Sequence, residues 1–190
     1  LDLAATPVDL LACGAQKWLL GPWGSGFLYV RRALVPQLVP AAVGWLAVQG
    51  SDDFARLTAY DPARWPDALW DDARRFEVRT LPHQDFAGMV ASLALFERLG
   101  PAAVAAHVQA LADRIVRWCD GRDDVRLATP ADPARRAGIV AVVPRDAAAA
   151  AARLRAAGVA HSVREGAVRL SPHGYNSAAE VDRALAALAG

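Results

Sequence analysis

The junction at Gly100 and Pro101 constrains the fold of this 190-residue chain most strongly. From Gln84 onward the apolar residues have helical spacing, and glycine commonly follows the last residue of a helix. Proline is favoured in the first turn, so Pro101 is expected to begin a second helix. The apolar stripe of that second helix consists of Val104, Val108, Leu111, Ile115 and Trp118. The sequence thus predicts two consecutive helices that break at Gly100.

Short apolar runs and helical segments follow this second helix, which is expected to end at Gly121. We expect strands over residues 125–128, 138–143, 159–163 and 167–171, and an alanine-rich helix between Asp146 and Gly158. Ser177 and Glu180 have the spacing of a capping box, which predicts the start of a last helix. This order is typical of a small α+β domain with its helices on one face of a sheet.

The residues before Gly100 have a different character. Residues 8–13 and 27–30 are expected to form strands, separated by a glycine-rich loop. Residues 36–75 have little periodicity and contain Trp45, Trp65 and Trp70. Long irregular stretches commonly cover a site or an interface. We therefore divide the chain into residues 1–100 and residues 101–190.

Composition and charge exclude several classes of function. The chain is 54% apolar and 22% charged, which fits a globular protein with a core. Its 21 basic and 20 acidic residues give a net charge of +1, and no basic stripe indicates nucleic-acid binding. The long uncharged run 33–51 is interrupted by prolines, so we expect a loop and no membrane partner. Cys13 and Cys119 form neither a disulfide framework nor a zinc spacing, so we predict no metal site and a cytoplasmic location.

Only one of the 21 basic residues is a lysine, Lys17. A bias toward arginine can replace lysine wherever any cation serves, but not where the amine must lose its proton. Lys17 lies between a strand end and a glycine-rich loop, where the floor of a cleft and the neighbouring Trp18 would lower its pKa. A free amine is what Schiff-base chemistry needs. The alternative is a solvent-exposed lysine beside an ordinary hairpin; a phosphate-binding P-loop is excluded because the lysine precedes the glycines.

Four segments, in this order, carry a resemblance to a known family. They are Gln16–Val30 (QKWLLGPWGSGFLYV), Gly44–Trp45, Arg75–Pro82 (RFEVRTLP) and Val168–Ser177 (VRLSPHGYNS). They resemble the cofactor-lysine segment and the later landmarks of class V aminotransferase-like enzymes, which depend on pyridoxal phosphate (PLP) and have fold type I. The family includes cysteine desulfurases, kynureninase-like lyases and isopenicillin N epimerase-like proteins. The motif variants are most similar to the epimerase-like and lyase-like branch.

The resemblance implies an α/β fold and a set of roles. The chain would be the end of a PLP-transferase large domain followed by a small α+β C-terminal domain. Lys17 would hold PLP as an internal aldimine and move the proton at the α-carbon of an amino acid substrate. Gln16 would contact the cofactor phosphate, and Thr80 would reach the phosphate of a partner subunit's cofactor. Arg79 replaces the usual glycine, which either adds a cation near that phosphate or alters the loop. Arg169 would grip the substrate α-carboxylate, and its alternative is an arginine in an ion pair on a strand.

Several residues of these motifs have less defined roles. Trp45 either lines the mouth of the site or packs in a core or interface. His173 and Asn176 are expected to shape a turn and cap the last helix, and Tyr175 to pack. Cysteine desulfurases carry a nucleophilic cysteine in the region that corresponds to residues 159–166, where this chain has none. Transaminase, lyase and epimerase chemistry remain open.

The resemblance also indicates what this chain lacks. In the family, an aspartate beneath the pyridine nitrogen, a group over the ring and a phosphate loop precede the lysine, and here 16 residues precede it. We therefore expect this chain to be a C-terminal portion with half of the cofactor site, to bind PLP weakly on its own, and to form a homodimer in the full-length protein. The alternative is a non-catalytic scaffold or dimerisation module without PLP.

Overall fold

The computed structural model describes residues 2–56 and 68–190. The chain divides into two compact units, Leu1–Leu95 and Phe96–Gly190, and each is described by itself. The division lies within helix α1 (His83–Leu99), slightly before the boundary predicted at Gly100. Trp65 and the rest of residues 57–67 lie outside the described residues.

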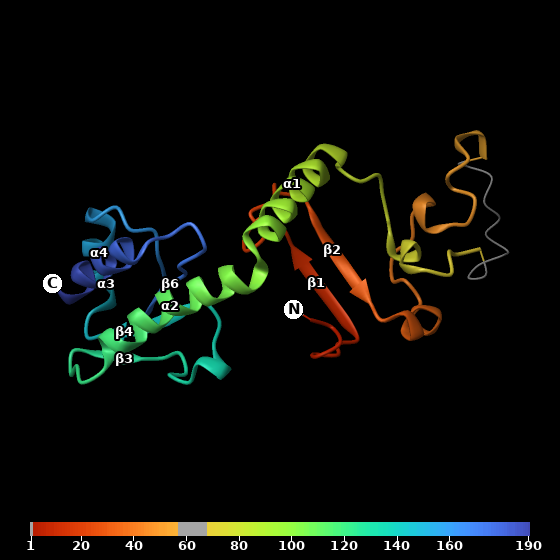
Figure 1. Cartoon of the computed structure of the whole chain (residues 1–190). Helices are drawn as coiled ribbons and strands as arrows, with labels where there is room; N and C mark the ends of the chain where they lie inside the picture. Colours follow the sequence, from red (N-terminus) through yellow and green to blue (C-terminus); the bar gives the residue numbers. More distant parts are fainter. Residues whose placement is uncertain (1, 57–67) are drawn as a thin grey trace. The chain divides into compact units, whose positions relative to one another are not determined.

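The first unit contains a two-stranded antiparallel sheet (Figure 1). Strands β1 (Leu10–Gly14) and β2 (Gly26–Val30) pair from Leu10 opposite Val30 to Gly14 opposite Gly26. Both predicted strands are thus confirmed, with slightly shifted ends. A Cβ atom at position 26 would lie 2.5 Å from the carbonyl oxygen of Cys13, so only glycine lets the strands approach this closely. The loop that contains Lys17 begins at this end of the sheet, after Gly14.

The irregular stretch after β2 consists of short turns linked by tertiary contacts. The 3₁₀ turns among the described residues of this unit are η1 (Arg32–Gln37), η2 (Trp45–Ala47), η3 (Phe54–Arg56) and η5 (Ala73–Phe76). Val48 and Leu69 form an isolated antiparallel bridge, and the indole nitrogen of Trp70 donates to the carbonyl of Leu46 at 3.0 Å. These contacts fix a segment that has no periodic pattern in the sequence.

The backbone passes closest to itself at Gly44. A Cβ atom there would lie 1.6 Å from the carbonyl oxygen of Val78, so the position has no room for a side chain. Nearby, a guanidinium nitrogen of Arg75 donates to the carbonyl of Val35 at 3.1 Å. These contacts hold the segment that leads into Arg79 and Thr80.

Helix α1 supports the glycine-rich loop between β1 and β2. A Cβ atom at Gly88 would lie 2.6 Å from the Pro22 ring, and the hydroxyl of Ser92 donates to the carbonyl of Leu20 at 3.0 Å. The helical periodicity predicted from Gln84 is confirmed. The loop that carries Lys17 therefore rests on one face of this helix.

The second unit is a four-stranded antiparallel sheet with three further helices (Figure 1). Its strand order is β3-β4-β6-β5. The strands are β3 (Val125–Leu127), β4 (Val140–Pro144), β5 (Ser162–Arg164) and β6 (Ala167–Leu170). The helices are α2 (Pro101–Cys119), α3 (Ala147–Ala156) and α4 (Ala178–Ala189), with a 3₁₀ turn, η6, at Pro133–Arg135. The predicted small α+β unit, with its order of strands and helices, is confirmed.

The core of this unit lies between the sheet and the helices. Alternate residues of β4 and β6 point inward, and helices α2, α3 and α4 contribute aliphatic side chains. Full burial of such a side chain stabilises the fold by roughly 1.5–3 kcal/mol. The largest fully buried side chains of this unit are Ile115, Leu154, Leu188, Val140, Val142 and Val168. The opposite face of the sheet is left uncovered by these helices.

The helix ends have the capping groups that the sequence predicts. Gly100 has a φ of 81° and directly precedes α2, which begins at Pro101. The Asp146 carboxylate accepts hydrogen bonds from two backbone N–H groups in the first turn of α3. Ser177 and Glu180 form a complete capping box at the start of α4. These local signals determine where the helices begin.

One predicted strand is displaced. We expected a strand over 159–163, but β5 begins at Ser162. Gly158 has a φ of 68°, and its N–H and that of Val159 donate to the carbonyls of Arg155 and Leu154. This is a Schellman motif, in which Val159 completes the end of α3 and packs against the core. Val159 is therefore apolar because it closes a helix, not because it lies in a strand.

Candidate functional site

A closed loop at the end of β1 presents Lys17. The N–H of Ala15 donates to the Ser25 carbonyl at 3.0 Å, and the Ala15 carbonyl accepts from Gly21 at 2.9 Å. Ala15 is fully buried. Within the loop, the N–H of Leu20 donates to the Lys17 carbonyl at 3.1 Å. The backbone on both sides of Lys17 is thus held by hydrogen bonds.

The Lys17 side chain is exposed, and so is that of Trp18, at 45%. Within the part of the chain that the structure describes, the Lys17 amine makes no hydrogen bond or ion pair. The expectation of a desolvated lysine at the floor of a cleft is wrong for these residues. Burial of an amine needs packing from residues distant in sequence, which local patterns do not report. The amine is instead accessible to an incoming carbonyl compound.

Gln16, the predicted phosphate contact, turns back over the end of β1. Its side-chain oxygen lies 2.6 Å from where a Cβ atom of Gly14 would be. Gln16 is half-buried, and Gly14 leaves the space that its amide occupies. The glycine and the glutamine therefore fit each other, and the contact with phosphate stays a prediction.

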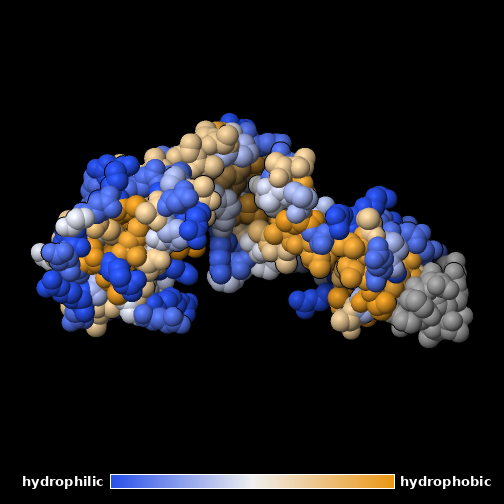
Figure 2. Space-filling view, turned by 90° about the horizontal axis from the view of Figure 1, so that it is seen from below, coloured by the Kyte–Doolittle hydropathy of each residue, from blue (hydrophilic) through white to orange (hydrophobic). Residues whose placement is uncertain are grey.

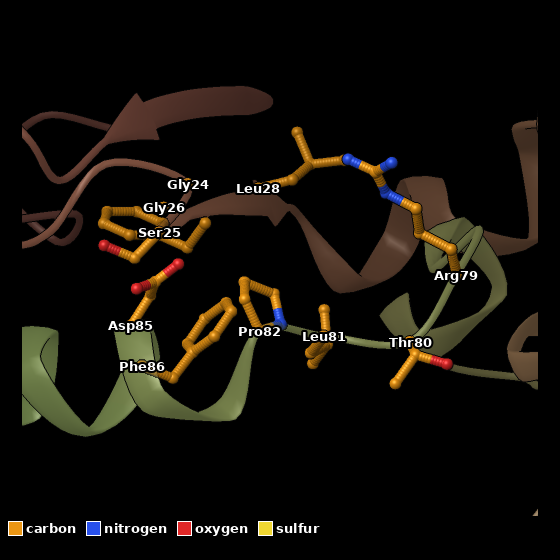
Figure 3. Close-up of a pocket in the computed structure, with 11 residues that line it drawn as sticks. Gly24, Ser25, Gly26, Leu28, Arg79, Thr80, Leu81, Pro82, Asp85 and Phe86 are labelled. Atoms are coloured by element: carbon orange, nitrogen blue, oxygen red, sulfur yellow. The ribbon is translucent and has the colours of Figure 1, made fainter.

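Thr80 and Arg79 line a cavity of about 680 Å³ in the same unit (Figure 3). The cavity lies between the β2 end of the hairpin and the start of α1. In Figure 3 the Arg79 side chain extends toward Leu28, whereas the Asp85 carboxylate lies near Ser25. Opposite charges therefore lie at different ends of the cavity. Its lining residues are Gly24, Ser25, Gly26, Phe27, Leu28, Arg79, Thr80, Leu81, Pro82, Asp85 and Phe86.

Asp85 was not predicted from the sequence as part of this cavity. A Cβ atom at Gly24, which has a φ of 92°, would lie 3.0 Å from an Asp85 carboxylate oxygen. The one sequence signal is its place in the first turn of α1, where an acidic residue also stabilises the helix dipole. That ordinary helix signal hides its position at the cavity.

Arg169, the predicted carboxylate clamp, lies on β6 in the second unit. It is directly opposite Ala141 on β4 and Ser162 on β5. Its Nε atom is buried without a hydrogen-bond partner, and no described residue forms an ion pair with it. The alternative of an arginine engaged in an ion pair is thus not observed among residues 2–56 and 68–190. Gln16, Lys17 and Thr80 belong to the first unit and Arg169 to the second.

The residues that follow Arg169 form a hydrogen-bonded turn. The backbone N–H of His173 donates to the side-chain oxygen of Asn176 at 2.9 Å, and the Asn176 N–H donates back to the His173 carbonyl. The His173 ring stacks on Tyr175 and meets Phe96 edge to face. Asn176 accepts from His107 through its backbone carbonyl. His173 and Asn176 thus shape the turn before α4, as predicted, but the residue that caps the helix is Ser177. Tyr175 was expected to pack and is 70% exposed.

No group of three His, Cys, Asp or Glu side chains in residues 2–56 and 68–190 is arranged to hold a metal ion. No single helix in these ranges is long and apolar enough to cross a membrane, and α1 and α2 reach that length and composition only when taken together across their bend.

A family model confirms the resemblance. The model described as aminotransferase class-V matches residues 1–184, so the chain belongs to the class V aminotransferase family. An uncharacterised aminotransferase, YcbU, of Bacillus subtilis (strain 168) is 31% identical over 97% of this chain and 46% of its own length. Isopenicillin N epimerase of Streptomyces clavuligerus is 30% identical over 100% of this chain and 50% of its own. The chain spans about half the length of these relatives.

Solved structures show the same fold. The cystine C-S lyase C-DES, in complex with its product cysteine persulfide, superposes with a TM-score of 0.81 at 24% identity, over 100% of this chain and 48% of that chain. The apo cysteine desulfurase of Thermococcus onnurineus NA1 has a TM-score of 0.79 at 23% identity, over 97% of this chain and 47% of that chain. The predicted fold class is therefore confirmed.

The residues present fit pyridoxal phosphate. Lys17 offers an accessible amine with no competing side-chain partner in the described residues. Arg169 offers a buried donor that no described residue uses, which suits an anionic substrate.

Proposed function

We propose that the protein to which this chain belongs is a PLP-dependent enzyme that acts on an amino acid. The observation that carries the proposal is the single lysine of the chain, presented on a hydrogen-bonded loop in a segment of the class V family. When bound, PLP supplies an electron sink that stabilises negative charge at the substrate α-carbon. The protein must then hold the cofactor, orient the substrate and move one proton.

Lys17 would perform two of these tasks. Its amine would hold the cofactor, and as a free amine it would accept and return the proton at the substrate α-carbon. An arginine cannot do either at neutral pH because its guanidinium does not give up its proton. The hydrogen bonds from Ala15 to Ser25 and from Gly21 to Ala15 fix the loop, which limits how far the amine can move.

The other predicted residues would bind the cofactor phosphate and the substrate carboxylate. Gln16 and Thr80 would donate to phosphate oxygens, with Thr80 acting on the cofactor of a partner subunit and Arg79 adding positive charge beside it. Arg169 would hold the substrate carboxylate, since a planar guanidinium can donate two parallel hydrogen bonds to a carboxylate. Transamination, lyase and epimerase chemistry all begin with removal of the same proton.

A homodimer follows from this proposal, because Thr80 serves the partner's cofactor. The first unit exposes large apolar residues that suit burial against further protein, and Figure 2 shows apolar surface in this part of the chain. They include Leu10, Trp23, Phe27, Leu28, Val39 and Phe54. A cytoplasmic location stays a prediction, supported by the two free cysteines.

Exchange of the α-proton tests the proposal because it is common to all three reaction types. We would incubate the full-length protein and PLP in D₂O with single amino acids and follow loss of the α-proton signal by NMR. Wild type should exchange at least one amino acid, and K17R should abolish the exchange. The double variant K17R/R155K, which moves the one lysine to helix α3, is the matched control and should not restore it. Exchange that persists in K17R contradicts the proposal.

A further inference from the structure

Ser162 and Arg169 are directly opposite each other on strands β5 and β6. Side chains of directly opposite residues lie on the same face of a sheet, with Cβ atoms about 4.5–5.5 Å apart. The Ser162 hydroxyl oxygen and Arg169 Nε are both buried, and neither has a hydrogen-bond partner. Buried polar atoms nearly always have a partner, so two that lack one side by side indicate a ligand that they share.

The residues beside Arg169 on its face of the sheet are small and uncharged. Val168 and Leu170, on either side of Arg169 in the chain, point into the core, so Arg169 lies on the other face of the sheet. Its cross-strand neighbour on β4 is Ala141. Alanine and serine are both too short to cover the guanidinium, and neither carries a charge to balance it. The guanidinium charge and the buried Nε–H donor of Arg169 are therefore available to a group that is not part of the sheet.

The charge of this face selects an anion. Alternation along the short strands places Arg126 of β3 and Arg164 of β5 on the same face as Arg169. Both are exposed, and no ion pair holds either of them within residues 2–56 and 68–190. The four strands carry no carboxylate on any face. A negatively charged group is thus attracted to the sheet at Arg169.

We propose that Ser162 is a second donor to the substrate α-carboxylate and works as a pair with Arg169. This inference rests on the proposed function, which gives Arg169 the carboxylate. The guanidinium donates through planar N–H groups to one side of the carboxylate, and the serine hydroxyl donates to an oxygen on the side of β5. The buried Ser162 hydroxyl thereby gains a hydrogen-bond partner. Its hydrogen bond also fixes the rotational orientation of the carboxylate, which is less well defined when Arg169 is the only donor.

Arginine side-chain NMR on the 190-residue chain tests the pair directly. The Nε–H signal of Arg169, identified by its loss in R169Q, would be followed while L-alanine is added, with L-alaninamide as the probe that lacks the carboxylate. Wild type should respond to L-alanine and not to L-alaninamide. In S162A the dissociation constant for L-alanine should rise about tenfold, as expected for the loss of one hydrogen bond to a charged group. In S162T, which keeps a hydroxyl, it should stay within about twofold of wild type on the same grounds.

Two controls separate a paired donor from a general effect. R126Q removes a positive charge from the same face without touching the pair, and it should change the dissociation constant far less than S162A does. An S162A protein that binds L-alanine as wild type does, or a wild type that responds equally to L-alaninamide or not at all, overturns the inference. Failure of the proposed function has a different signature, because proton exchange would then be insensitive to K17R whatever the result at Ser162.

Discussion

Gly44 offers the sharpest test of how the first unit is built. Its backbone angles are those of an ordinary extended residue, with a φ of −118° and a ψ of 178°, so alanine meets no conformational strain there. The obstacle is the backbone of Val78. In G44A the new methyl group would start 1.6 Å from the Val78 carbonyl oxygen, whereas real Cβ atoms essentially never approach a heavy atom more closely than 3.0 Å.

The loss of stability in G44A depends on how easily the Val78 carbonyl group can move. Overpacking in a core costs about 1–3 kcal/mol when side chains can adjust. Here the neighbour is a carbonyl group, which cannot rotate away without moving Glu77 and Arg79 along with it. We therefore expect G44A to lower the free energy of unfolding of the first unit by about 3 kcal/mol, at the upper end of that range. The displaced segment leads directly to Thr80, so its cavity should change as well.

Tryptophan fluorescence during urea unfolding measures this change. Five of the six tryptophans lie in the first unit, and Trp118 alone lies in the second. In G44A the urea midpoint measured by tryptophan fluorescence should thus fall, whereas the unfolding of the helices of the second unit should be unchanged. G174A is the matched control, because a Cβ atom there would meet only a Val104 methyl group at 3.2 Å. A G44A midpoint equal to that of G174A would contradict this prediction.

Two further predictions concern the second unit. The Ser177 N–H and hydroxyl hold the pKa of Glu180 below its ordinary value of 4.5, and the Arg114 guanidinium lowers the pKa of Asp182. The stability that these two carboxylates provide is complete above their unfolded-state pKa values, and it is lost as pH falls through their lower folded-state pKa values. In E180Q, unfolding followed by circular dichroism should therefore show a smaller loss of stability at acid pH than in wild type. A loss equal to that of wild type would contradict this prediction. Burial raises the pKa of the Cys119 thiol to about 11, whereas Cys13 is half-exposed. Iodoacetamide at pH 8 should therefore label Cys13 in the folded chain and Cys119 only after unfolding. Equal labelling of the two cysteines in the folded chain would contradict this prediction.

Local signals predicted the second unit well. Gly100, Asp146 and the box of Ser177 and Glu180 each act within a few residues, so the sequence shows both partners of each contact. The displaced start of β5 had a local cause too. An apolar residue after a glycine suits both a strand and a Schellman motif, and the register of hydrogen bonds decides between them.

For the candidate site, the sequence singles out residues but does not report what surrounds them. Lys17 is conspicuous because no other lysine exists in the chain, but its exposure depends on what packs over the loop. Ser162 gave no signal because its significance comes from lying opposite Arg169, and cross-strand register is a long-range property. Asp85 was hidden by its second role in the first turn of α1.

In the proposed function, Lys17 is the covalent anchor of the cofactor. The most direct measurement is to mix the full-length protein with PLP, reduce with borohydride and locate the modified peptide by mass spectrometry. Within this chain Lys17 is the only lysine, so a label here has one possible side-chain position. We predict a phosphopyridoxyl group on Lys17, and weaker labelling when the 190-residue chain is used alone. A full-length protein that carries no label on Lys17 would contradict it.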